Sequence, residues 1–155
     1  MAFAKLAAAA LGAMASAWLA APPARAQSAA QPAAQPSLPL ELNRLETVAG
    51  AAEGCRVWMV LANDAPGAAA IATLRLDLVV FGADGQIARR AAVELAPIGA
   101  GRTAVRLFDL AGLPCERIGR LLVNDVLACR IGGEEVAQCA DRLAPSSRAG
   151  IRFGL

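Results

Sequence analysis

The sequence predicts an all-β domain, an antiparallel β-sandwich of about seven strands with two disulfides. Three observations predict it. Short apolar runs alternate with polar residues at a period of two, as in strands that bury one face. Turn-forming pairs such as Asp84-Gly85 and Gly132-Gly133 separate these runs. Four cysteines in the same region favour disulfides over free thiols.

Residues 1–26 are predicted to form a cleavable signal peptide. Lys5 supplies a positive charge, residues 6–21 form an apolar segment, and Ala24-Arg25-Ala26 matches the small-x-small pattern that precedes cleavage. The absence of an Arg-Arg pair near the start favours the general secretory (Sec-type) route. An uncleaved anchor is the alternative, but the segment is shorter than the ~20 residues that span a bilayer. We therefore expect cleavage after Ala26, a periplasmic or secreted protein, and no stable membrane insertion.

A linker and the first two strands are expected next. Residues 27–39 are rich in Pro, Ala and Gln and form a linker, and the sandwich domain occupies 40–155. A first strand begins at Leu40 and is irregular around Asn43. In a second strand, residues 55–61 alternate so that Trp58 faces away from Cys55, Val57 and Met59. We interpret Trp58 as packing in a second layer in preference to a ligand platform.

Residues 71–110 form the central part of the prediction, three consecutive strands. The first has Leu74, Leu76 and Leu78 on one face and Arg75 and Asp77 toward solvent. A hairpin at Asp84-Gly85 leads to a second strand, whose apolar face is formed by Ile87, Ala91, Val93 and Leu95, with Arg89 as a flaw in the pattern and Arg90 opposite. In the third strand Thr103, Val105 and Leu107 face one way and Arg102 and Arg106 the other.

The carboxyl-terminal third is the ambiguous part of the sequence. Residues 117–131 fit both a strand and a helical stripe, and we favour a long strand with a bulge near Asn124-Asp125, because both residues are poor choices for a helix interior. Residues 134–143 are expected to form a last strand or a short helix. Residues 145–155 are expected to be a polar, arginine-bearing tail.

The cysteines Cys55, Cys115, Cys129 and Cys139 allow three pairings. With an immunoglobulin-like strand order, the start of the Cys55 strand lies beside the end of the 102–110 strand, close to Cys115. Cys129 and Cys139 flank the Gly132-Gly133 turn. We therefore favour Cys55 with Cys115 and Cys129 with Cys139. Zinc or redox use is disfavoured, because no Cys-x-x-Cys pair or histidine is present.

Composition argues against an enzyme. The chain has no histidine and no tyrosine, and Lys5 is its only lysine, so the usual general base, Schiff-base amine and Ser-His nucleophile are missing. A hydrolase that uses only carboxylates is a remaining alternative. No cofactor or metal is expected, and turn chemistry explains Asp84-Gly85 and Asn63-Asp64 better than calcium binding.

The charge balance argues against nucleic acid as a partner. Lys5 and Arg25 are two of the 15 basic residues, so the mature chain carries 13 against 13 acidic ones. Such a neutral chain lacks the concentrated positive charge that phosphate backbones require. The exposed arginines of the predicted strands are candidate interaction residues: Arg75, Arg90, Arg102 and Arg106.

A family resemblance covers residues 55–110. The run VLAND, the strand ending VVFGADGQI and the segment LAPIGAGRTAVRLFDL resemble the small immunoglobulin-like domains of the FxLYD kind in exported bacterial proteins. The residues that carry it are Asn63, Phe81, Asp84, Gly85, Pro97, Gly101 and Phe108. The four cysteines depart from that pattern. The chain as a whole also resembles uncharacterised signal-bearing proteins of Gram-negative bacteria.

These observations together predict an exported, non-enzymatic binding or accessory module. It is expected to act on an unidentified periplasmic protein, through a sheet edge or the arginine-bearing face. The alternative is a carrier that holds a small ligand in a pocket between the sheets.

Overall fold

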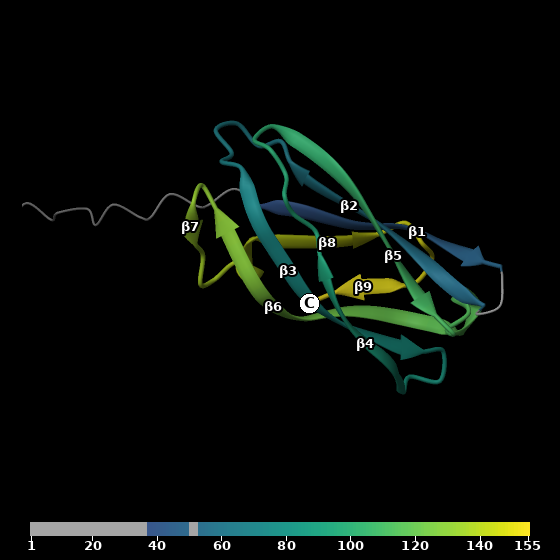
Figure 1. Ribbon diagram of the computed structural model, residues 1–155. Helices are drawn as coiled ribbons and strands as arrows, with labels where there is room; N and C mark the ends of the chain where they lie inside the picture. Colours follow the sequence, from purple (N-terminus) through teal and green to yellow (C-terminus); the bar gives the residue numbers. More distant parts are fainter. Residues whose placement is uncertain (1–36, 50–52) are drawn as a thin grey trace, which may run out of the picture. The chain divides into compact units, whose positions relative to one another are not determined.

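The computed structural model describes residues 37–49 and 53–155, which contain strands and two short 3₁₀ turns. The predicted signal peptide and most of the predicted linker lie outside these residues. The elements, in chain order, are β1 (Leu38–Val48), β2 (Gly54–Asn63), β3 (Ile71–Gly82), β4 (Ile87–Glu94), β5 (Arg102–Ala111), η1 (Cys115–Arg117), β6 (Ile118–Ile131), β7 (Glu134–Glu135), η2 (Ala140–Arg142), β8 (Leu143–Ser147) and β9 (Arg152–Gly154) (Figure 1).

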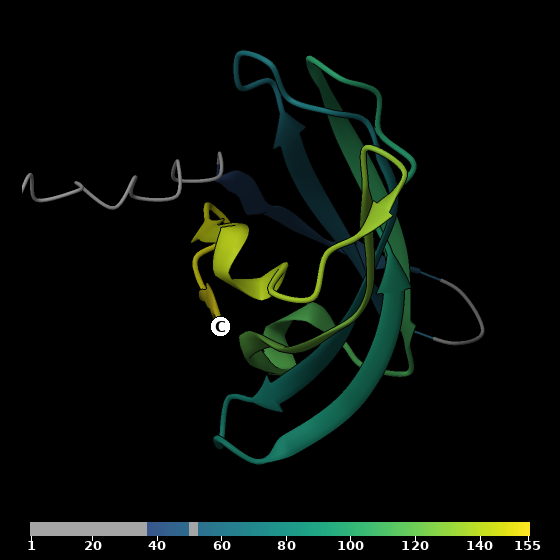
Figure 2. The same ribbon diagram turned by 90° about the vertical axis from the view of Figure 1, so that its left-hand side faces the viewer.

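The strands form two sheets, as the predicted sandwich requires. The first, sheet A, has the order β5-β2-β1-β8, and the second, sheet B, has the order β4-β3-β6-β7, with β9 also paired to β6. Strands β8 and β9 contact each other and so join the two sheets along one side. Figure 2 shows these carboxyl-terminal segments, in yellow, gathered on one side of the domain. The β1-β2-β5 and β3-β6 neighbours are those of an immunoglobulin-like sandwich.

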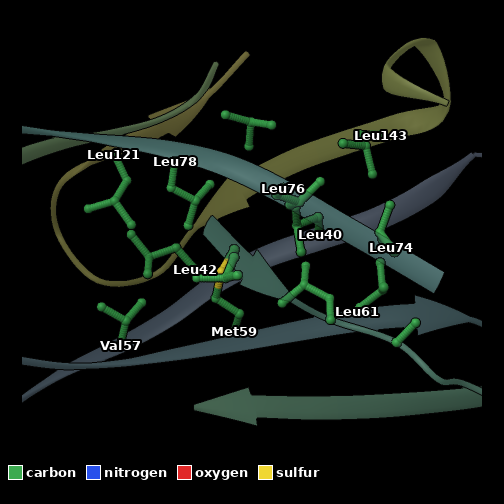
Figure 3. Close-up of a cluster of buried hydrophobic side chains, with 14 of the residues drawn as sticks. Leu40, Leu42, Val57, Met59, Leu61, Leu74, Leu76, Leu78, Leu121 and Leu143 are labelled. Carbon is green, nitrogen blue, oxygen red and sulfur yellow. The ribbon is translucent and has the colours of Figure 1, made fainter. Parts of the chain in front are cut away.

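The core lies between the two sheets and consists mostly of leucine. Sheet A contributes the row Val57, Met59 and Leu61 of β2, and sheet B contributes Leu74 and Leu76 of β3, each with an exposed fraction of 1 % or less. Figure 3 shows these side chains pointing toward one another from the two sheets, together with Leu40, Leu42, Leu78, Leu121 and Leu143. Alternation in the sequence therefore produces the burial that the sandwich needs.

Several local predictions are confirmed. The hairpin after β3 turns at Gly85, whose φ of 81° is a conformation that glycine adopts without strain. Residues 118–131 form one strand, β6, and its pairing with β3 shifts register at Asn124, where a bulge was predicted. β1 likewise shifts register at Asn43. β1 begins at Leu38, two residues before the predicted start of the first strand at Leu40.

The assignment of faces on β5 is wrong. The row that faces the core contains Phe108 and Leu110, because Phe108 lies opposite the buried Val57 of β2. Val105 and Leu107, predicted to be the buried face, belong to the outward row and are 47 % and 45 % exposed. On β4 the apolar face is also mostly exposed, with Val93 buried and Ile87 67 % exposed, because β4 is an edge strand.

The predicted polar tail is also wrong, because residues 145–155 contribute to both sheets. β8 pairs with β1, and β9 pairs with β6. Both pairings are parallel, so the sandwich is not antiparallel throughout. The segment 134–143, predicted as a strand or a short helix, contains the two-residue strand β7 and the 3₁₀ turn η2.

Both predicted disulfides are present. Cys55 is bonded to Cys115, with a Cα–Cα distance of 4.8 Å, and Cys129 is bonded to Cys139, with a Cα–Cα distance of 6.2 Å. Cys55 lies opposite Leu110 at the end of β5, which brings it beside η1 as the strand order implied. The first bridge therefore ties the start of β2 to η1, and the second ties β6 to the segment before η2.

The two bridges should contribute unequally to stability. They enclose sequence separations of 60 and 10 residues, and the chain-entropy model assigns about 4 kcal/mol to the longer loop and about 3 kcal/mol to the shorter one. We expect the double variant C55A/C115A to lose about 1–2 kcal/mol more free energy of unfolding than C129A/C139A. Urea unfolding of the two variants measures this difference, and an equal or reversed order contradicts the loop-closure explanation.

Candidate functional site

The four sheet edges differ in how they are protected from pairing with another chain. β8 has five residues and contains Pro145, and β7 has two residues. The β3–β4 pairing is interrupted by a bulge beside Phe81, and β4 carries Arg89 and Arg90. Short length, proline, bulges and charges are the features that prevent edge-to-edge association. β5 has none of these protections apart from its three charged residues, because its ten residues pair with β2 in unbroken register and it contains no proline.

An apolar patch lies on the outer face of sheet A, beside this edge. Trp58 lies opposite Leu107, and Val60 lies opposite Val105, so two strands contribute adjacent pairs to the same face. Val105 and Leu107 are among the large hydrophobic side chains that the described residues leave exposed. We call these four residues the β5 patch. The β5 patch therefore places an apolar surface directly beside the backbone edge of β5.

The indole of Trp58 is held in place by charged neighbours on β1. Its Nε1–H donates to Glu46 Oε2 at 2.7 Å, and the guanidinium carbon of Arg44 lies 4.5 Å from the ring centroid. Arg44 and Glu46 also form an ion pair at 3.3 Å. Trp58 was predicted to pack in a second layer. The ring is half-buried and lies against Arg44 on the outer face of sheet A.

An ion pair marks one end of the β5 patch. Arg56 donates to both carboxylate oxygens of Asp109, at 2.8 and 2.9 Å. The hydrogen bonds from Arg56 hold the pKa of Asp109 below its ordinary value, and the carboxylate raises the pKa of Arg56 in return. Both side chains are partly exposed, so the pair fixes the positions of the two side chains but contributes little to the free energy of unfolding.

The structure does not bring the four predicted interaction arginines together. Arg75 and Arg90 lie on the outer face of sheet B, whereas Arg102 and Arg106 lie on β5 in sheet A. Arg106 is in the inward row, opposite Met59, and donates to Pro97 O at 2.8 Å. Arg102 is exposed at the start of β5. The predicted arginine-bearing face is therefore two separate groups on different sheets.

Asp77 is buried, contrary to the prediction that it points to solvent. Arg90 on β4 donates to both of its carboxylate oxygens, at 2.7 and 2.8 Å, and the amide of Asn124 on β6 donates at 2.7 Å. The β6 bulge places Asn124 over the carboxylate. The Arg90 hydrogen bonds hold the pKa of Asp77 below its ordinary value, against the opposing effect of burial. This cluster links β3, β4 and β6, three of the five strands of sheet B.

Other classes of site receive no support from the described residues. Within residues 37–49 and 53–155, no group of three or more His, Cys, Asp or Glu side chains is placed to hold a metal ion. In the same part of the chain, no helix is long and apolar enough to cross a membrane. The two disulfides indicate folding in an oxidising environment.

Comparison with known proteins supports the fold and nothing further. No protein-family model matches the sequence, and no curated protein matches it. The domain is similar to a solved structure from Escherichia coli, described as the structural characterization of IrmA, with a TM-score of 0.52 and 14% sequence identity. The similarity covers 71% of this chain and 92% of that chain. At this identity the likeness shows a shared β-rich sandwich fold.

The Asp77 cluster makes the stability of the domain depend on pH. Because the pKa of Asp77 is lowered in the folded state, its ionised form stabilises the fold above its unfolded pKa of about 3.9, and this contribution is lost as the pH falls below that value. We expect Asp77→Asn to be less stable than the wild type at neutral pH, and to lose less stability on acidification. Urea unfolding at about pH 7 and about pH 3 measures both effects.

Asp109→Asn is the matched control, because it removes a carboxylate that also receives two hydrogen bonds from one arginine but is exposed. We expect a smaller effect from this exposed pair. A pH dependence of Asp77→Asn equal to that of the wild type contradicts the role given to Asp77.

Proposed function

We propose that this protein is an exported, non-enzymatic binding module that captures an extended segment of a partner protein along β5. The observation that carries the proposal is the combination of a regular ten-residue edge strand with the exposed apolar side chains of the β5 patch. A free edge offers backbone donors and acceptors in a row, and a polypeptide that adds as a further strand satisfies them. The alternate side chains of that polypeptide then supply specificity.

The chemistry of β5 specifies the partner segment. Val105 and Leu107 point outward at a period of two, so a neighbouring strand with apolar residues at the same period covers them and extends the surface of Trp58 and Val60. Arg102 is exposed at the start of the strand and has no acidic partner among the described residues. An acidic residue at the corresponding end of the partner segment complements it.

The packing between the sheets favours this function over a ligand carrier. Core side chains from both sheets are fully buried in one cluster, and they fill the space that a carrier uses for its ligand. The hollows that are lined by named residues lie at the ends and outer faces of the sheets. No specific observation therefore favours the carrier.

The proposed location is the periplasm or the extracellular space. The two disulfides support export to an oxidising compartment. The signal-like sequence of residues 1–26 supports the Sec route with cleavage after Ala26. The resemblance of residues 55–110 to exported FxLYD-type domains supports the same assignment. A non-enzymatic protein in this compartment is expected to act by binding a partner.

Site-specific photo-crosslinking tests the proposal. A photoreactive side chain is placed at Val105, at Leu107 or at the control position Ile87, which is exposed on the β4 edge of the other sheet. Strand addition predicts that Val105 and Leu107 label one partner segment, at partner residues two apart, and that Ile87 does not label it. It also predicts protection of β5 backbone amides from hydrogen exchange when the identified segment is added as a peptide.

Charge substitutions on the same face provide the quantitative test. We expect Val105→Lys and Leu107→Lys each to weaken binding of the identified segment by about tenfold or more, because each places a charge inside an apolar contact. Ile87→Lys makes the same chemical change on the other sheet and is expected to leave binding unchanged. Equal binding by all three variants, or binding without protection of β5 amides, overturns the proposal.

A further inference from the structure

Two arginines on the outer face of sheet B are placed side by side without a counter-charge. Arg120 of β6 and Arg152 of β9 are direct neighbours in the parallel pairing of these strands, which Figure 1 shows next to each other near the carboxyl end. Neighbouring strands lie about 5 Å apart, and the two side chains project from the same face. Like charges directly opposite each other destabilise a sheet. This arrangement therefore requires a physical explanation.

Their surroundings supply little compensation for the positive charge. The guanidinium of Arg120 lies 5.5 Å from the ring centroid of Phe81, and neither arginine has an ion pair with a carboxylate of the described residues. Arg56, Arg90 and Arg148 are, by contrast, each paired with a carboxylate at 2.7 or 2.8 Å. What distinguishes Arg120 and Arg152 is that two arginines without an ion pair to a described carboxylate are direct neighbours across paired strands.

Both arginines line the same two surface hollows. One, of about 200 Å³, is lined also by Phe81 and by the backbone of the β3–β4 turn, and the other, of about 390 Å³, is lined also by Ser147 and Phe153. No acidic residue is among the described residues that line either hollow. The Ser147 hydroxyl oxygen accepts from Ala149 N at 3.3 Å, which leaves its O–H as a donor. The two guanidinium groups and the Ser147 hydroxyl are therefore hydrogen-bond donors at this surface.

We propose that Arg120 and Arg152, with Ser147 beside them, form a binding site for a phosphate group. A phosphate group presents several acceptor oxygens and carries one or two negative charges, and each guanidinium can donate two parallel hydrogen bonds to it. Binding replaces a repulsion between two cations with attraction of both to one anion. Phe81 orients the Arg120 guanidinium from its other side. Arg120 and Arg152 belong to the opposite sheet from the β5 patch, and Ser147 is on β8 at the far edge of sheet A from β5, so the site is independent of the proposed function.

Titration with inorganic phosphate tests the site. At constant ionic strength maintained with chloride, we expect saturable shifts of backbone amide signals confined to residues 119–122, 147 and 152–154. Arg152→Gln and Arg120→Gln are each expected to weaken phosphate binding by about tenfold, because each removes a pair of charge-assisted hydrogen bonds. Arg89→Gln removes an exposed arginine of β4 and is the matched control, with binding unchanged. Absence of saturable shifts, or equal weakening by Arg89→Gln, overturns the proposal.

A second readout is independent of ligand binding. In buffer of low ionic strength without phosphate, Arg152→Gln is expected to raise the melting temperature, because it removes the repulsion from Arg120. Phosphate is then expected to raise the melting temperature of the wild type and to have little effect on the variant. A variant that is no more stable than the wild type without phosphate contradicts the repulsion on which the inference rests.

A vesicle experiment identifies the source of the phosphate group. Sedimentation with phosphatidylglycerol vesicles, compared with phosphatidylcholine vesicles, measures binding to an anionic lipid headgroup. In one outcome the protein sediments with phosphatidylglycerol vesicles but not with phosphatidylcholine vesicles. If that binding is lost in Arg152→Gln and in excess inorganic phosphate, the result supports the site and assigns it to a lipid headgroup. Phosphate binding without vesicle retention supports the site and assigns it to a free phosphate compound.

Discussion

The meeting of two apolar rows, one on β2 and one on β3, is the constraint on which the rest of the structure depends. Each row comes from a strand in the middle of its sheet, and together they form the centre of the buried cluster. Because side chains alternate along a strand, placing Met59 and Leu76 in the core places Trp58 and Asp77 on the opposite faces of their sheets, where neighbouring side chains cover Asp77. The outer faces on which both proposals rest are therefore a consequence of how the core is filled.

The sequence predicted those parts of the fold that short-range chemistry determines. Leucine alternation located β3, and Asp84-Gly85 located its hairpin. The strand order led to the Cys55–Cys115 pairing, and the Gly132-Gly133 turn led to the Cys129–Cys139 pairing. The prediction failed on β5, where both faces carry apolar residues and only pairing with β2 decides which one is buried. It failed again at residues 145–155, because the parallel pairings of β8 and β9 join segments far apart in the chain and leave no local signal.

The same distinction applies to the candidate sites. Four arginines were identified as a face from their alternation, but the topology divides them between two sheets. Arg120 and Arg152 were missed, because they become neighbours only through the pairing of β6 with β9. The burial of Asp77 depends on a bulge that brings Asn124 across from another strand. Which residues are charged can be read from a sequence, but which charges meet is a property of the strand pairing.

The parallel pairing of β1 with β8 has a consequence for the order of folding. Leu38, the first residue of β1, lies beside Leu143, and Leu42 lies beside Ser147. A chain that emerges from its amino end can form the β1–β2 and β3–β4 hairpins early, but it cannot complete either sheet until β8 and β9 have emerged. During that interval β1 presents an open, leucine-bearing edge to its surroundings. The domain therefore gains its full cooperativity only after β8 and β9 have paired with β1 and β6.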